Sequence, residues 1–210
     1  MDKFTGIPFE ANRIKAIVFD LDNTLVSSDM NFFWLRDELG CPAGIDLLTF
    51  ADDIACPNQR ADVAQLILDH EMEDARSSYP MPGCASILRY IETQAMHTAI
   101  ITRNCFEAAS TKVQHNNLNI SRIISREHFA PKPAPDALNS LADEWQLFPN
   151  EILYVGDYLY DLQSAFNANM PSCLVTHGID KPFEHQASIA VPHLDDLRQL
   201  LPNNNKSNNK

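Results

Sequence analysis

Two aspartates that stand two residues apart, Asp20 and Asp22 in the segment FDLDNTL, are the strongest chemical signal in the sequence. They leave a short apolar run, and side chains two residues apart point to the same side of an extended chain. One carboxylate could act as a nucleophile that accepts a phosphoryl group. The other could protonate the leaving oxygen and then activate water. Taken alone, the pair is equally consistent with two acids in a turn after a strand.

Three further signals are weaker by themselves. Thr102 in IITRN could offer a hydroxyl to phosphate oxygens beside the free N–H groups of a helix start, although a Thr there is commonly a helix cap. Lys132 stands between two prolines that stiffen its loop, so its ammonium could neutralise a phosphate, although a solvated surface lysine is the favoured interpretation of this residue alone. Asp157 and Asp161 in GDYLYD are spaced to share one side of a helical turn. They could bind Mg²⁺ or interact only with the helix dipole.

Strands and helices that alternate along the chain must position these residues. The expected strands are Ile14–Asp20, His97–Thr102, Glu151–Asp157 and Ser172–Thr176, with weaker candidates at Arg122–Ser125 and Ala187–Val191. The expected helices between them are Gly83–Gln94, Asn104–His115, Pro135–Trp145 and Leu159–Asn167. Such alternation predicts an α/β fold with a Rossmann-like parallel sheet. Ligands in such folds bind beyond the carboxyl ends of the strands, where all the candidate residues stand.

One segment interrupts this alternation directly after the first strand. Residues 27–79 contain no convincing strand and predict three helices, at Asn31–Leu39, Ile45–Asp52 and Asn58–Ser77. Within it, Phe33 and Trp34 could line a pocket, but packing in a core is the favoured interpretation. We therefore expect a Rossmann-like core of residues 1–26 and 80–202, a small α-helical cap of residues 27–79, and a disordered tail at 203–210, which reads NNNKSNNK.

Composition excludes some functions. The formal net charge of -12 argues against a nucleic-acid or membrane-surface binder, since both need basic patches. It does not exclude a small anionic substrate, because a metal ion and one local lysine can reverse the field in a cleft. The sequence shows no signal peptide and no apolar run of about 18 residues. Its five cysteines form no CxxC pair, so we expect reduced thiols in a cytoplasmic protein.

The four signals together resemble the haloacid dehalogenase-like superfamily from Ile14 to about Thr176. Its motifs stand here, in the family's order, as DLDNT, Thr102, Lys132 and GDYLYD. The helical insertion and the segment PGCASILRYI resemble the phosphoglycolate-phosphatase-like branch. The resemblance implies that Mg²⁺ is the cofactor and a small phosphorylated metabolite the partner.

The resemblance also implies a role for each motif residue. Asp20 would attack phosphorus and bind Mg²⁺, and Asp22 would be the general acid/base and offer its backbone carbonyl to the metal. Thr102 and Lys132 would hold the phosphoryl group. Asp157 would ligate Mg²⁺, with Asp161 either ligating it or holding a metal-bound water.

Two departures from the family pattern stand out. The insertion at residues 27–79 is short for this branch, so either the substrate is less enclosed or a neighbouring subunit completes the lid. The protein could accordingly be a monomer or a homodimer. Arg103 stands between Thr102 and Asn104, where many relatives place Asn directly after the Thr. Arg103 and Asn104 are therefore candidate phosphate-binding residues, with a solvent-facing Arg103 as the alternative.

Hydrolysis of a small phosphomonoester through an aspartyl-phosphate on Asp20 is the favoured function. A sugar-phosphate phosphomutase would carry the same motifs. Dehalogenase chemistry is disfavoured because it does not need the second acid, Asp22. A non-catalytic phosphate-binding regulatory protein is also disfavoured. A response-regulator receiver domain lacks both the helical insertion and the late GDxxxD element, and this chain lacks no motif residue.

Overall fold

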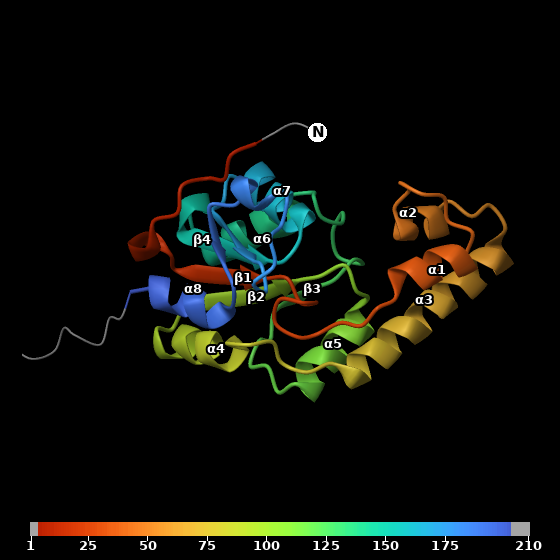
Figure 1. The fold of residues 1–210 in the computed structure, drawn as a ribbon, viewed down its shortest axis with the longest axis horizontal. Helices are drawn as coiled ribbons and strands as arrows, with labels where there is room; N and C mark the ends of the chain where they lie inside the picture. Colours follow the sequence, from red (N-terminus) through yellow and green to blue (C-terminus); the bar gives the residue numbers. More distant parts are fainter. Residues whose placement is uncertain (1–3, 203–210) are drawn as a thin grey trace, which may run out of the picture.

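A six-stranded parallel sheet, in the order β3-β2-β1-β4-β5-β6, lies at the centre of the computed structural model, which describes residues 4–202 (Figure 1). The strands are β1 (Ala16–Phe19), β2 (His97–Ile101), β3 (Ile123–Ile124), β4 (Ile152–Gly156), β5 (Ser172–Val175) and β6 (Ile189–Val191). The predicted α/β fold is confirmed, and β3 and β6 correspond to the two weaker strand candidates. The tail expected at residues 203–210 lies outside the described residues.

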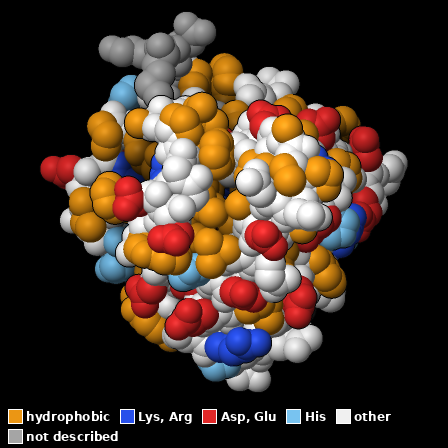
Figure 2. Space-filling view, turned by 90° about the vertical axis from the view of Figure 1, so that its right-hand side faces the viewer, with side chains coloured by type: hydrophobic (Ala, Val, Ile, Leu, Met, Phe, Trp, Pro, Cys, Tyr) orange, Lys and Arg blue, Asp and Glu red, His pale blue; other side chains and the backbone are white. Residues whose placement is uncertain are grey.

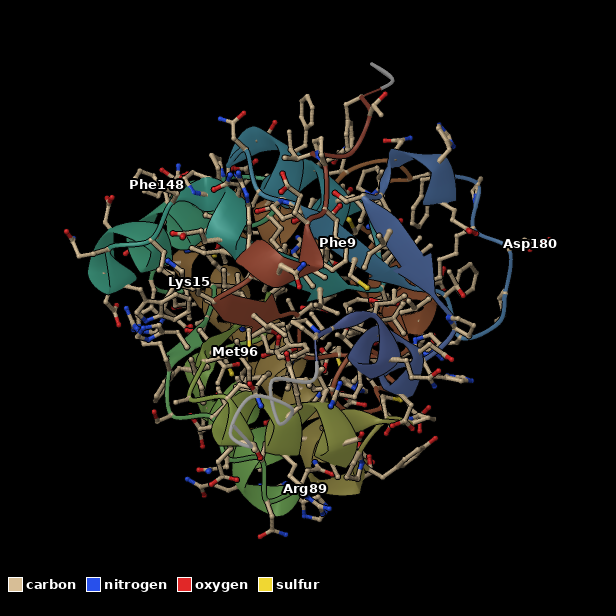
Figure 3. All side chains as sticks on the ribbon, turned by 90° about the vertical axis from the view of Figure 1, so that its left-hand side faces the viewer. Phe9, Lys15, Arg89, Met96, Phe148 and Asp180 are labelled. Atoms are coloured by element: carbon tan, nitrogen blue, oxygen red, sulfur yellow. The ribbon has the colours of Figure 1, made fainter. Side chains whose placement is uncertain are left out.

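The strand order changes direction between β1 and β4, and open α/β sheets bind ligands in the crevice at such a point. Phe19 at the end of β1 pairs with Ile100 of β2 and Val155 of β4, so the three strands end at the same edge. Figure 3 views the opposite edge, where Lys15 and Met96 precede β1 and β2. The residues that follow β1, β2 and β4 therefore meet on the far side of that view.

Helices cover both faces of the sheet. On one face lie α4 (Cys84–Thr93), α5 (Phe106–His115) and α8 (Leu194–Leu200); on the other lie α6 (Asp136–Trp145) and α7 (Leu159–Asn167) (Figure 1). Short 3₁₀ helices span Ala11–Arg13, Pro149–Glu151 and Glu184–Gln186. Strand β1 shows how the sheet is buried, since Ile17 and Phe19 enter one hydrophobic core while Ala16 and Val18 enter the other. A strand buried on both faces explains its unbroken apolar run.

Three helices of the insertion, α1 (Phe32–Glu38), α2 (Leu47–Asp52) and α3 (Pro57–Ser77), project from one side of the sheet (Figure 1). We refer to residues 27–79 as the cap; the division of the chain into core and cap domains at these residues stays a prediction. The cap has a small hydrophobic core of its own, formed by Leu35, Cys41, Leu47, Ala51 and Ile67. The C-terminal half of α3 packs against α5, which ties the cap to the sheet layer.

All five cysteines are free thiols, and only Cys56 among them is exposed. Between residues 4 and 202, no helix is both long and apolar enough to cross a membrane.

Candidate active site

A cavity of about 500 Å³ lies between the cap and the carboxyl ends of the strands. It is lined by every site residue expected from the sequence: Asp20, Asp22, Thr102, Arg103, Asn104, Lys132, Asp157 and Asp161. The cap contributes mainly apolar side chains, together with Arg36, Asp46 and Glu71. Figure 2 views the molecule from the cap side and shows acidic side chains scattered among hydrophobic ones. An anionic substrate would therefore depend on cations inside the cavity.

Lys132 joins two of the acids at the bottom of the cavity. Its Nζ lies 2.6 Å from Oδ1 of Asp20 and 2.7 Å from Oδ1 of Asp161. Its side chain is only 6% exposed, so the alternative of a solvated surface lysine is wrong. Burial favours the neutral amine, but Asp161 and Asp20 outweigh it and hold the pKa of Lys132 well above its ordinary value. The ammonium is therefore fixed and charged beside the candidate nucleophile.

Asp20, Asp157 and Asp161 form an acidic cluster that could hold a metal ion. Each offers a carboxylate oxygen, and these atoms lie within 4.8 Å of one another. Burial, reinforced by the neighbouring acids, raises the pKa of Asp20 to about 8 and that of Asp157 to about 6. The three carboxylates share two lysines, Lys132 and Lys181, so part of their negative charge is not offset. A divalent cation that prefers oxygen ligands, such as Mg²⁺, fits this donor set.

The GDYLYD segment brings its two acids together through a turn and the start of a helix. A Cβ atom at Gly156 would lie 2.3 Å from Cγ of Asp161, so only glycine allows this close approach. Helix α7 begins at Leu159 rather than at Asp157. Asp161 lies in its first turn and accepts the Tyr158 N–H at 3.0 Å through Oδ2. Asp161 therefore stabilises the helix start and also faces Lys132, whereas its binding of Mg²⁺ stays a prediction.

Asp22 is held by two donors from the core. Its Oδ1 accepts a hydrogen bond from the Lys112 ammonium, and its Oδ2 accepts one from the Asn104 amide at 2.9 Å. Burial raises the pKa of Asp22, although Lys112 and Asn104 act in the opposite direction. Its side chain is not among the three acids of the potential metal group. The expected contribution of its backbone carbonyl to a metal stays a prediction.

Thr102 and Arg103 follow β2. The Thr102 hydroxyl accepts the Asn104 N–H at 3.1 Å, whereas the residue that caps α5 is Cys105. Thr102 is therefore not the helix cap that the alternative interpretation suggested. Arg103 donates to Asp46 at the start of α2, and its guanidinium lies 5.6 Å from the ring centre of Tyr160. It thus binds the cap rather than facing solvent freely, and its contact with substrate stays a prediction.

Three ion pairs across the cap–core boundary were not expected from the sequence. In each the cap provides the acid and the core the base: Asp46–Arg103, Glu71–Arg126 and Asp74–Lys112. The sequence signal for these pairs was the position of the charged residues. Glu71 and Asp74 lie on the buried face of α3, and Lys112 lies on the buried face of α5. Charged residues at positions of helical apolar periodicity indicate buried partners.

Two aromatic residues of the cap do not behave as expected. Phe33 is 84% exposed, so the favoured prediction of core packing is wrong for it. Trp34 is partly exposed and packs against the His70 ring, with centroids 4.7 Å apart. The neighbouring Phe32 lines the cavity instead. In a short amphipathic helix, one step along the chain turns a side chain by about 100° and changes its environment.

Comparisons with known proteins agree with this geometry. The sequence profile of the haloacid dehalogenase-like hydrolases matches residues 44–175, a segment that holds Thr102, Lys132 and the GDYLYD acids but begins after Asp20 and Asp22. An uncharacterized hydrolase of Saccharomyces cerevisiae is 29% identical, over 98% of this chain and 99% of the yeast protein. A phosphoglycolate phosphatase of Pseudomonas putida is 27% identical, over 90% of this chain and 79% of that protein.

Solved structures support the same assignment at the level of the fold. The crystal structure of a hydrolase from Pseudomonas syringae superposes with a TM-score of 0.72 at 19% sequence identity, covering 89% of this chain and 97% of that one. The sequence relatives confirm the resemblance to the phosphoglycolate-phosphatase-like branch, and all the candidate site residues line the cavity. The chain belongs to the haloacid dehalogenase-like hydrolase family.

Proposed function

We propose that this hydrolase is a Mg²⁺-dependent phosphatase that cleaves a small phosphomonoester through an aspartyl-phosphate on Asp20. The observation that carries the proposal is the placement of Asp20 between a fixed ammonium and two further carboxylates, with Asp22 in the same cavity. This arrangement supplies a nucleophile, a cation for the phosphoryl oxygens and a separate proton donor.

The proposed reaction has two steps, formation of the aspartyl-phosphate and its hydrolysis. First, a carboxylate oxygen of Asp20 attacks phosphorus, the ester P–O bond breaks, and Asp22 gives its proton to the leaving oxygen. Then water attacks the phosphorus of the aspartyl-phosphate, Asp22 takes a proton from that water, and the P–O bond to Asp20 breaks. Inorganic phosphate leaves, and both carboxyl groups return to their starting states.

The remaining cavity residues bind and orient the phosphoryl group. Lys132 would hold phosphoryl oxygens while it remains close to Asp20, and Thr102 and Asn104 would donate from the end of β2. Asp20, Asp157 and Asp161 would bind Mg²⁺, together with the Asp22 carbonyl. When bound, the ion supplies positive charge that offsets the charge of the phosphate and of the acidic cluster.

A small phosphorylated metabolite fits this cavity. Its volume of about 500 Å³ lies within the range of small-molecule sites. The sequence relative named as a phosphoglycolate phosphatase acts, by its name, on a small phosphomonoester. We extend that class of substrate, but not the particular compound, to this protein.

Phosphate release from a panel of phosphorylated metabolites, with Mg²⁺ or with EDTA, tests the proposal. We expect release that requires Mg²⁺ and falls by at least about 10³-fold in Asp20→Asn, because the covalent step needs the carboxylate. Asp62→Asn, an exposed aspartate in the cap, is the matched control. Isomerisation of a sugar phosphate without free phosphate would favour the mutase alternative. An Asp20→Asn variant that keeps most of its activity would overturn the proposal.

A further inference from the structure

Lys112 is a lysine whose side chain is completely buried, in the last turn of helix α5, which covers the sheet. Its ammonium pairs with Asp22 on one side and with Asp74 of the cap on the other. A lysine without paired charges at such a position would be strongly unfavourable. Its presence therefore requires both carboxylates, and each of them is in turn fixed by the ammonium.

Asp74 links this lysine to the chain segment that enters the cap. One of its oxygens, Oδ1, accepts the Asp29 N–H at 2.6 Å, and the other, Oδ2, accepts the Ser28 hydroxyl at 2.8 Å as well as Lys112. Residues 28 and 29 follow the DLDNT motif by only a few positions. The ammonium thus connects helix α3, the entry segment of the cap and the proton donor of the site.

Lys112 stands behind Asp22 and does not line the cavity, whereas Asp22 and Asn104 do. Within residues 4–202, no other cation forms an ion pair with Asp22. Because Lys112 takes Oδ1, the second oxygen, Oδ2, is the one directed to the cavity-lining Asn104. That oxygen can exchange its neutral amide partner for the leaving oxygen of a substrate, while the charged contact at Oδ1 is kept.

We propose that Lys112 is a positioning residue that holds Asp22 in the orientation needed for proton transfer and couples that orientation to the seating of cap helix α3. The inference rests on the proposed function, because it takes Asp22 to be the proton donor. Lys112 itself touches neither the substrate nor the phosphorus. Its effect is therefore transmitted through Asp22, and it depends on how much a given reaction needs that proton.

Leaving groups that differ in basicity separate this role from a general structural one. An alkyl phosphate releases a basic alkoxide and needs a proton donor, whereas p-nitrophenyl phosphate releases a stable phenolate without one. General acid catalysis contributes about 10²–10⁴-fold. We expect Lys112→Met to lower kcat/KM for the preferred alkyl phosphate by about 10²-fold, and for p-nitrophenyl phosphate by less than about tenfold.

The experiment compares wild type, Lys112→Met, Asp22→Asn and the double variant on both substrates with Mg²⁺. If Lys112 acts through Asp22, adding Lys112→Met to Asp22→Asn causes no further loss of kcat/KM. Lys15→Met, which removes an exposed lysine at the opposite edge of the sheet, is the control for a Lys-to-Met change. If Lys112→Met does not fold, Lys112→Met/Asp74→Leu replaces the buried cap–core pair by apolar side chains, a change that folded proteins often tolerate.

The outcomes distinguish the two proposals. Equal losses on both substrates in a folded Lys112 variant, or losses that add to those of Asp22→Asn, would overturn the positioning role and leave the phosphatase proposal intact. A wild-type protein that releases phosphate from neither substrate nor the metabolite panel would overturn both. A selective loss on the alkyl phosphate that vanishes in the Asp22→Asn background would support the role of Lys112.

Discussion

The Lys132 ammonium nitrogen lies 2.6 Å from Oδ1 of Asp20, although 112 residues separate the two side chains in the sequence. The same nitrogen also contacts Asp161, so one cation bridges an acid that follows β1 and an acid in the first turn of α7. This bridge spans the point at which the strand order changes direction. The Lys132 ammonium therefore joins residues from the two sides of the binding crevice.

Replacing Lys132 by Met should remove both catalysis and part of the folding stability. Phosphate release should fall by about 10²–10³-fold, because a fixed cation at the phosphoryl oxygens is lost. The free energy of unfolding should fall by about 3–5 kcal/mol without Mg²⁺, since two buried carboxylates lose their partner. Urea unfolding with and without Mg²⁺ measures this, and Mg²⁺ should recover part of the loss. Unchanged stability in EDTA would contradict the bridge.

The acidic cluster predicts how stability depends on pH and on Mg²⁺. The pKa values of about 8 for Asp20 and about 6 for Asp157 lie above the ordinary value of 3.8. Between about pH 4 and pH 8 the folded, metal-free protein therefore binds more protons than the unfolded chain, and these groups make it less stable as pH rises. Mg²⁺ competes with those protons, so it should stabilise the protein more at about pH 8 than at about pH 5.

Thermal unfolding with EDTA or with saturating Mg²⁺ across this pH range measures the difference. Of Asp20 and Asp157, Asp20 has the higher raised pKa, so the metal-free melting temperature of Asp20→Asn should depend less on pH. A gain from Mg²⁺ that is equal or larger at the acidic end would show that the cluster is not the metal site.

Arg103→Gln tests whether the residue after Thr102 contacts the substrate. We expect KM to rise about tenfold, roughly 1.4 kcal/mol of binding free energy, with a smaller change in kcat. Asp46→Asn frees Arg103 from the cap and should raise KM less. Equal effects of the two variants would mean that Arg103 serves only to hold the cap. Arg122→Gln, which removes a surface pair with Glu144, is the matched control.

Gly156→Ala should disable the proposed metal site without replacing any of its acids. The added Cβ would meet the Asp161 carboxyl group at 2.3 Å, so Asp161 must leave its contacts with Lys132 and Tyr158. We expect loss of at least about 10²-fold in activity and weaker Mg²⁺ binding by calorimetry. Gly40→Ala, where nothing lies within 4 Å but φ is +63°, should cost only about 1–2 kcal/mol of stability and keep activity.

The sequence predicted those parts of the fold that depend on local pattern. The buried strands β1 and β4 were predicted because their apolar runs are unbroken, and the helices of the cap because residues 27–79 contain no convincing strand. Helix α8 was not assigned, although its buried Leu194 and Leu197 show the spacing of a helix. The candidate site residues all line the cavity because they follow strands that end at one edge.

The pairings between distant segments could not be predicted in the same way. Nothing in the local sequence shows that Lys112 reaches Asp22 and Asp74, since the contact depends on how α3 packs against α5. The pairing of Arg103 with Asp46, which lies 57 residues away in the cap, was likewise not visible in the sequence. Side-chain partners that lie far apart in the sequence follow from tertiary packing, which local sequence patterns do not reveal.

The two ends of the cap lie side by side where they join the core. The Ser27 N–H donates to the Tyr79 carbonyl at 2.8 Å, and the Met81 N–H donates to the Leu25 carbonyl at 2.9 Å. Because its two ends are adjacent, the insertion can be exchanged as a unit for another cap that starts and ends at the same two points. Lys112 sets a condition on such an exchange, because a replacement lid has to present an acid where Asp74 stands. For the proposed phosphatase, substrate range can thus change by exchange of the cap while the catalytic residues of the core stay the same.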